Sequence, residues 1–227
     1  MADYTTNIEN FLVSLGFIRT PTPLNHKTRP IVFHAVAGAG KTTALIKIIQ
    51  DYPVTVATNS DTLCLTSGAQ IVKYTPGVRY NIVDEYQLCP EIPDADIIIG
   101  DPLQIGATHT LAHYSLNRTL RFGRQTAAFV QAVTGIHIEA TFDDILEKGD
   151  PFTRDPVGQI ICGSPVACRL LQWHKVEHLH PAQAVGKTFD SVTVYASSKD
   201  LSDIPLQHRY VILTRHRTLL LILAPGH

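Results

Sequence analysis

The sequence predicts an α/β fold with two lobes, each built around a parallel β-sheet. Short apolar runs rich in Ile and Val alternate with helical patterns along the chain, and the alternation resumes in the second half. Continuous β-branched runs of this kind are typical of parallel strands that are covered on both faces. The length of 227 residues is compatible with one large domain or with two small ones.

Composition narrows the functional classes. The chain is 44% hydrophobic and 17% charged, which excludes a disordered chain. Its net charge of −1 excludes a globally basic nucleic-acid binder but not a local basic groove. The four cysteines form no C-x-x-C pair, so neither a zinc ribbon nor a thioredoxin-like site is indicated. We expect no signal peptide, because polar residues such as Asp3 and Glu9 interrupt any apolar core at the N-terminus. We also expect no membrane span, because no apolar run approaches the ~18 residues that a span needs.

The first part of the chain is predicted to form an N-terminal helix and linker, over 1–25, and a first lobe, over 26–112. In the helix, apolar residues from Ile8 to Leu15 repeat at helical spacing, and Gly16 is the stop signal. The predicted elements of the lobe are strands at 31–33, 54–56, 82–83 and 97–99 and a helix at 42–50.

The second lobe is predicted over 113–227 from the same alternation. Its expected elements are helices at 126–133 and 166–173 and strands at 136–138, 159–161, 192–195, 210–213 and 219–223. The stretch 141–156 is acidic and rich in turn residues, so we expect a loop there. Trp173 lies in an apolar helical pattern and is interpreted as a core residue rather than as a base-stacking one.

The strongest motif is the glycine-rich segment HAVAGAGKTT at 34–43, which lies between a predicted strand and a predicted helix. Glycines let the backbone amides turn inward as a nest for phosphate oxygens, and the helix N-terminus adds partial positive charge. Lys41 supplies a point charge to the β- and γ-phosphates of ATP, and the Thr42 hydroxyl is a ligand for Mg²⁺. The expected phosphate-binding residues are Gly38, Ala39, Gly40, Lys41, Thr42 and Thr43. The segment departs from the common pattern at one position, where Ala35 stands in place of a glycine. The alternative to a phosphate-binding loop is a glycine-rich turn with a surface lysine.

Two acidic residues follow the predicted strand at 82–83. Asp84 is expected to hold Mg²⁺, and Glu85 is expected to orient or deprotonate the attacking water. The alternative is a pair of solvated acids at a strand end. After the strand at 97–99, Gln104 is expected to sense the γ-phosphate, and the alternative is an ordinary turn ended by Pro102.

Taken in order, these segments resemble the motifs of superfamily 1 helicases. The resemblance continues at 114–122, 183–192 and 211–217, which match the fourth, fifth and sixth motifs of that family. It implies two RecA-like lobes with ATP between them, Arg121 as the arginine of the fourth motif and Arg215 as an arginine finger. Arginines can stabilise the charge that develops on the transferred phosphoryl group. For Arg121 the alternative is a solvated basic segment that includes Arg118 and Arg124.

A more specific resemblance rests on the glycine-rich loop, the Asp-Glu-Tyr at 84–86 and the mass of 25.0 kDa. Over roughly 8–225 the chain resembles the first triple gene block proteins of filamentous plant RNA viruses. That resemblance implies an ATP-dependent RNA helicase of the host cytoplasm that supports cell-to-cell movement and suppresses RNA silencing. It also implies single-stranded RNA, other viral movement proteins and coat protein as partners, and it leaves homo-oligomerisation open.

Charge placement bears on RNA binding. No Lys or Arg occurs between Tyr80 and Asn117, whereas the chain after Asp203 carries three arginines and no acid. A basic track in the second half would suit RNA phosphates. Two rival functions remain: an NTP-dependent RNA-binding movement protein with little unwinding, and a P-loop kinase of a small molecule. His174 and His178 are interpreted as surface residues rather than as metal ligands.

Overall fold

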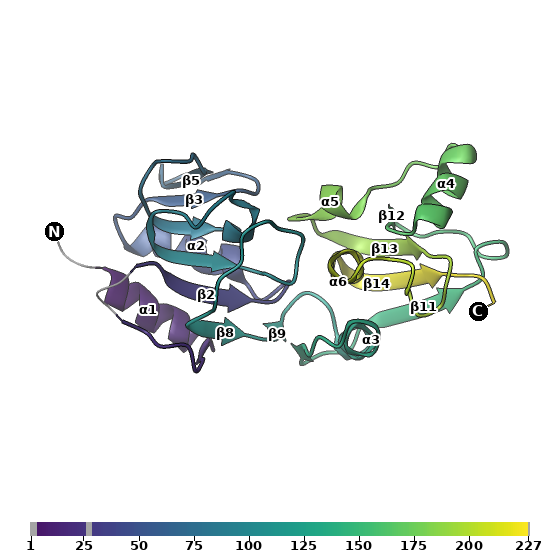
Figure 1. Cartoon of the computed structure of the whole chain (residues 1–227), viewed down its shortest axis with the longest axis horizontal. Helices are drawn as coiled ribbons and strands as arrows, with labels where there is room; N and C mark the ends of the chain where they lie inside the picture. The colour runs from purple at the N-terminus through teal and green to yellow at the C-terminus, as the bar shows by residue number, and fades with distance from the viewer. Residues whose placement is uncertain (1–3, 26–28, 227) are drawn as a thin grey trace. The chain divides into compact units, whose positions relative to one another are not determined.

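The computed structural model describes residues 4–25 and 29–226, which fold into two compact units (Figure 1). The first unit contains the described residues up to Pro102 together with Gly106–Asn117. The second contains Leu103–Ile105 and the described residues from Arg118 onward. The chain passes from the first unit to the second between residues 117 and 118, whereas the order of the motifs predicts a boundary between residues 112 and 113.

The first unit is built on an eight-stranded sheet with the order β1-β8-β2-β7-β6-β3-β5-β4. The six strands from β8 to β5 are mutually parallel, and β1 and β4 add antiparallel edges. The strands are β1 (Ile18–Arg19), β2 (Ile31–Ala35), β3 (Val56–Thr58), β4 (Leu63–Cys64), β5 (Gln70–Lys73), β6 (Tyr80–Asp84), β7 (Ala95–Gly100) and β8 (Tyr114–Leu116).

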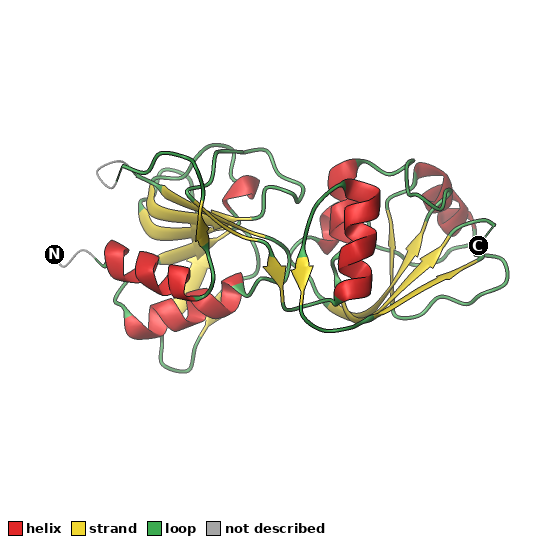
Figure 2. Ribbon diagram, turned by 90° about the horizontal axis from the view of Figure 1, so that it is seen from below, coloured by secondary structure: helices red, strands yellow, loops and turns green. Residues whose placement is uncertain are grey.

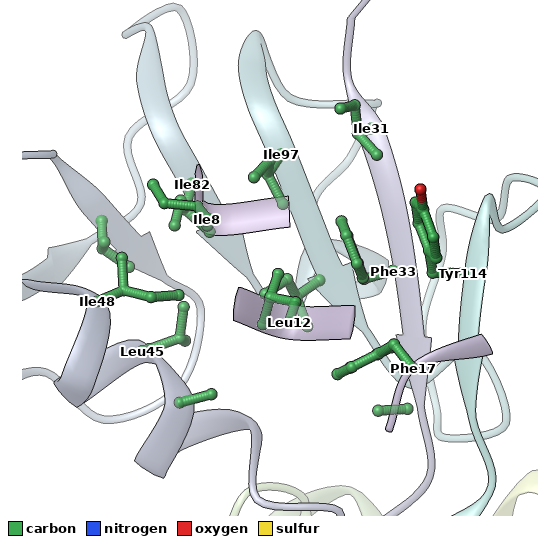
Figure 3. Packing of buried hydrophobic residues seen from close by; sticks show 14 of the residues in the cluster. Ile8, Leu12, Phe17, Ile31, Phe33, Leu45, Ile48, Ile82, Ile97 and Tyr114 are labelled. Carbon is green, nitrogen blue, oxygen red and sulfur yellow. The ribbon is translucent and has the colours of Figure 1, made fainter. Parts of the chain in front are cut away.

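Both faces of this sheet are covered, as the continuous apolar runs predict. Helices α1 (Thr5–Ser14) and α2 (Lys41–Asp51) lie on one face, and the short helix η1 (Tyr86–Leu88) follows β6 (Figure 2). Figure 3 shows Leu12 of α1 and Ile48 of α2 in one cluster with Phe33 of β2. Val32, the residue before Phe33, belongs to the cluster on the opposite face, because successive side chains of a strand alternate between faces.

The second unit is built on a four-stranded, fully parallel sheet with the order β11-β14-β13-β12. Its elements are β9 (Arg118–Thr119), α3 (Arg124–Thr134), β10 (Glu139–Ala140), β11 (Ile145–Gly149), β12 (Gln159–Cys162), α4 (Pro165–Trp173), α5 (Pro181–Ala184), β13 (Phe189–Tyr195), α6 (Leu206–Leu213) and β14 (His216–Leu223). Two α/β units with parallel sheets confirm the predicted fold class. No helix among the described residues has the length and apolar character that crossing a membrane requires.

Two predictions in the second half are wrong for reasons of burial. The segment 210–213, predicted as a strand, forms the last turn of α6. All four of its residues are fully buried, so the apolar run carries no periodicity that separates a helix from a strand. The stretch 141–156, predicted as a loop, contains β11, which pairs in parallel with β14 at the sheet edge. Its pattern is partly polar because an edge strand is only partly covered.

Three smaller expectations also differ. Residues 136–138 form no strand, since α3 ends at Gly135 in a left-handed cap and the chain leads directly to β10. The strand expected at 54–56 begins at Val56. Trp173, expected in the core, is 85% exposed, because α4 buries its opposite face through Ala167 and Leu171.

Candidate nucleotide-binding site

The glycine-rich loop lies between β2 and α2, as predicted. Gly38 and Gly40 have φ values of 77° and 89°, in the left-handed region that glycine adopts without steric cost. Gly40 is also the N-cap of α2. Ala35 is the last residue of β2 and is not among the residues with positive φ, so glycine is not required at this position.

The ammonium group of Lys41 lies against the loop. Its Nζ donates to the carbonyl oxygens of Ala35 at 3.0 Å and Val36 at 3.4 Å. The following residues, Thr42 and Thr43, are exposed in the first turn of α2. The loop therefore presents a cation, two hydroxyl groups and a helix N-terminus together, a combination suited to phosphate.

The two predicted acids lie at the end of β6 and are both buried. Asp84 is 5% exposed, and its Oδ1 has no hydrogen-bond partner among the described residues. Burial and the neighbouring Glu85 raise the pKa of Asp84 to about 7, while Lys41 acts in the opposite direction. A buried carboxylate with an unsatisfied oxygen needs a cation, so Asp84 fits a Mg²⁺ ligand.

Glu85 has an unusual backbone. Its φ of 52° and ψ of 41° lie in the left-handed region, which is uncommon for a residue other than glycine. Such conformations cost about 1–3 kcal/mol and persist where the surroundings enforce them, often at functional sites. The carboxylate accepts a hydrogen bond from Nε2 of Gln87, a fully buried residue that the motif interpretation did not single out.

A histidine–tyrosine pair beside the loop was also missed. His34 Nε2 and the Tyr86 hydroxyl are 2.7 Å apart, and their rings stack with centroids 5.8 Å apart. Burial lowers the pKa of His34 to about 4, with contributions from His109 and Lys41. His34 is therefore neutral near pH 7 and adds no second charge beside Lys41. The only sign of this pair in the sequence is that His34 and Tyr86 each carry a polar group near a stretch of apolar strand residues.

Metal binding by the protein alone is not indicated. The described residues contain no cluster of three His, Cys, Asp or Glu side chains able to hold a metal, at His174 and His178 or elsewhere. Mg²⁺ commonly uses one or two protein oxygens and completes its shell with water and substrate phosphates. Thr42 and Asp84 are the residues that would provide those oxygens.

After β7 the chain carries Asp101 and Gln104, which are 1% and 3% exposed. The backbone N–H of Asp101 donates to Gln87 Oε1 at 3.3 Å, so Asp101 is joined to the segment that carries Glu85. Gln104 lies in the segment Leu103–Ile105, which groups with the second unit.

The two predicted arginines converge within the second unit. Arg121 Nη1 donates to the carbonyl oxygen of Thr214 at 3.0 Å, and Arg215 Nη2 donates to the Thr214 hydroxyl at 2.9 Å. Arg215 is 1% exposed and lies between α6 and β14, not at the end of a strand. Thr214 thus brings together two arginines from distant parts of the sequence.

A buried carboxylate supports the same region. Asp144 Oδ1 accepts hydrogen bonds from the N–H groups of Gln125 and Thr126 at the start of α3, and its Oδ2 is 3.3 Å from His216 Nε2. Burial raises the pKa of Asp144, but hydrogen bonds led by those of His216 and Thr126 outweigh it and hold the pKa at about 2. Asp144 therefore fixes the helix that follows Arg121 to the strand that follows Arg215.

Comparisons with known proteins agree with this geometry. The sequence model of a family described as the viral superfamily 1 RNA helicase core domain matches residues 31–224. The chain is 35% identical over 221 residues to the movement and silencing protein TGBp1 of Indian citrus ringspot virus, covering 94% of each chain. It is 34% identical over 212 residues to the protein of that name from Lily virus X, covering 91% of this chain and 94% of the relative.

Solved structures show the same fold. The chain is similar to the Arterivirus nonstructural protein 10 helicase, with a TM-score of 0.54, 16% identity and coverage of 98% of this chain. For a complex of that helicase with DNA the TM-score is 0.55, at 15% identity and 97% coverage. In both cases the chain spans 57% of the solved chain. The predicted RecA-like helicase core is therefore confirmed as the fold.

Proposed function

The chain belongs to the viral superfamily 1 RNA helicase family, and from this premise we propose that it hydrolyses ATP with Mg²⁺ and uses the energy to unwind RNA. The observation that carries the proposal is a lysine and a buried carboxyl group that act on each other in the first unit. Lys41 of the glycine-rich loop acts electrostatically on Asp84, whose buried carboxylate has an oxygen without a hydrogen-bond partner among the described residues. A triphosphate with its divalent cation is the ligand class that such a site needs.

Each residue then has a role in hydrolysis. Backbone amides of Gly38 to Thr43 and the N-terminus of α2 hold the phosphates, and Lys41 neutralises the β- and γ-oxygens. Thr42 and Asp84 would hold Mg²⁺, which when bound draws charge from the phosphate oxygens. Glu85 accepts the proton of the water that attacks the γ-phosphorus, while the bond from that phosphorus to the bridging oxygen of ADP breaks.

Arg121, Arg215 and Gln104 also have roles in this proposal. Arg121 and Arg215 stabilise the transferred phosphoryl group, and their shared contact with Thr214 supports a joint role. Gln104 senses the γ-phosphate through its amide.

The cellular role is proposed from the names of the relatives. Proteins 31–35% identical to this chain are named movement and silencing proteins. We assign the chain a role in cell-to-cell movement of a plant virus and in suppression of RNA silencing, in the host cytoplasm. Single-stranded RNA is the proposed ligand, bound through phosphates, and other viral movement proteins and coat protein are the proposed protein partners.

Phosphate release tests the enzymatic proposal. We expect Mg²⁺-dependent ATP hydrolysis that single-stranded RNA stimulates and that a chelator abolishes. A P-loop kinase would instead transfer phosphate to an acceptor and release little inorganic phosphate. Hydrolysis that neither Mg²⁺ nor RNA affects would contradict the assignment.

A second candidate is an RNA-binding movement protein whose hydrolysis is slow and whose unwinding is negligible. The names of the relatives favour this candidate, because they mention movement and silencing but no helicase. Displacement of a labelled strand from an RNA duplex, with and without ATP, separates the two. ATP-dependent displacement supports the helicase, and RNA binding without displacement supports the alternative.

A further inference from the structure

We propose that Gln87 is the positioning residue for Glu85, and that it sets the direction of the carboxylate that receives the proton from water. The inference rests on the proposed function, because it takes Glu85 as the water-activating group. Gln87 lies in η1, two residues after Glu85, and is fully buried.

The amide of Gln87 bridges two elements of the site. Its Nε2 donates to Glu85 Oε2, and its Oε1 accepts from the backbone N–H of Asp101 at 3.3 Å. One end therefore needs a donor and the other an acceptor, and the neutral amide of glutamine supplies both. Through Gln87 the carboxylate is joined to the residue that follows β7.

The surroundings hold Gln87 in one place. A Cβ at Gly100 would lie 2.4 Å from Gln87 Oε1, and a Cβ at Gly106 would lie 2.6 Å from the carbonyl oxygen of Gln87. That carbonyl accepts hydrogen bonds from the N–H groups of Ala107 at 2.8 Å and Thr108 at 3.2 Å. Both neighbouring segments thus pack closely against Gln87, one at its side-chain amide and the other at its backbone carbonyl.

The left-handed backbone at Glu85 makes a bridge of this kind useful. That conformation follows the end of β6 and departs from its extended backbone, so the alternation of the strand does not set the direction of the Glu85 side chain. A hydrogen bond to a fixed donor restricts the carboxylate to one orientation. A misplacement of about 1 Å can cost 10²-fold in rate, so we expect loss of Gln87 to lower kcat by about 10- to 100-fold.

Two substitutions at Gln87 test the bridge. Gln87→Met keeps the length of the side chain but removes both hydrogen bonds. Gln87→Glu keeps an acceptor for the Asp101 N–H and, where the new carboxyl group is ionised, removes the donor to Glu85. Both should lower kcat for ATP while the dissociation constant of a non-hydrolysable ATP analogue stays within about twofold, because the side chain of Gln87 bonds to Glu85 and Asp101 and is not part of the proposed phosphate-binding loop.

Thr108→Val is the matched control. Thr108 is buried in the neighbouring segment whose N–H groups bond to the Gln87 carbonyl. Its hydroxyl donates to the carbonyl oxygen of Cys89 at 2.6 Å and not to Glu85. It should reduce stability to an extent similar to Gln87→Met and leave kcat nearly unchanged. Thermal unfolding of every variant keeps loss of fold separate from loss of rate.

A double-mutant cycle gives the decisive readout. In a Glu85→Gln background no proton acceptor remains to be positioned, so Gln87→Met should cause little further loss of kcat. A purely structural role would instead multiply the two losses, and that result would overturn the proposal. Wild-type kcat in both Gln87 variants would overturn it as well. If Glu85→Gln itself hydrolyses ATP at the normal rate, the proposed function has failed at Glu85, which is a distinguishable outcome.

Discussion

Replacing Gly100 with alanine should destabilise the first unit by about 1–3 kcal/mol, the usual cost of an extra methyl group in a packed core. The new Cβ would lie 2.4 Å from Gln87 Oε1 and 2.7 Å from a ring carbon of Tyr86, whereas real Cβ atoms essentially never approach within 3.0 Å. Both side chains are fully buried, so neither can move into solvent to make room. The backbone of β7 or the η1 segment must shift instead.

That shift should also reach the site. The shortest contact of the new Cβ would be with Oε1 of Gln87, the acceptor end of the amide whose donor end binds Glu85. We therefore expect kcat to fall together with stability in Gly100→Ala. Urea unfolding gives the free energy of unfolding, and phosphate release under conditions where the variant is folded gives kcat.

Gly77→Ala is the control for the same chemical change in the same unit. Gly77 has a φ of 78°, and no heavy atom lies within 4 Å of the position that a Cβ would take, so alanine there meets backbone strain and no neighbour. It should lose stability without losing kcat. If Gly100→Ala unfolds at the wild-type urea concentration and keeps the wild-type kcat, the close approach does not constrain this site and the reasoning is refuted.

Three further predictions concern single residues. Lys41→Ala should lower kcat by at least ~10²-fold in a phosphate-release assay, whereas Lys47→Ala, exposed on the same helix and paired with Asp51, should not change it. Arg215→Lys should lower kcat by ~10³-fold or more with little change in nucleotide affinity, because lysine lacks the planar fork, and the exposed Arg217→Lys should have no such effect. The folded-state pKa of Asp144, about 2, lies below its ordinary value of 3.8, so its contribution to stability is present above pH ~4 and is lost as the pH falls toward 2. Asp144→Asn should therefore show a weaker pH dependence of the unfolding free energy in that window, measured by denaturant titration.

Local patterns predicted the four central strands of the first unit, β2, β7, β6 and β3, and its helices α1 and α2, because these elements carry their own signals, but not β1, β4, β5 or β8. The segment around Phe33 is a continuous apolar run, and the loop after it contains the glycines that a left-handed turn requires. The strand ends that carry Asp84 and Asp101 followed from the same runs. In a parallel sheet such ends lie on one edge, so the order of the motifs was enough to bring the acids and the loop into one unit.

The second unit was harder to predict because burial and edges remove those signals. Helix α6 ends in four fully buried residues, and a last turn that is apolar on all sides has no polar face to reveal a helical period. Strand β11 is recognisable only beside β14, since its own residues are partly polar and partly exposed. Trp173 was expected in the core but lies in solvent, because a helix with a mixed apolar and polar pattern can leave its largest apolar residue exposed.

The residues of the candidate site also differ in how far their roles can be predicted from local sequence. Residues that carry chemistry, such as Lys41 and Glu85, stand in short motifs that any local window contains. The residues that orient them bond across the chain: Gln87 to Asp101 over 14 positions, Asp144 to His216 over 72 and Arg121 to Thr214 over 93. A buried polar group left without its partner costs about 1–3 kcal/mol, so the tertiary fold must supply these partners, and the local sequence around one residue does not identify the other. A polar residue within an apolar stretch, as Gln87 is between Tyr86 and Leu88, is then the sequence feature that marks where such a bond must exist.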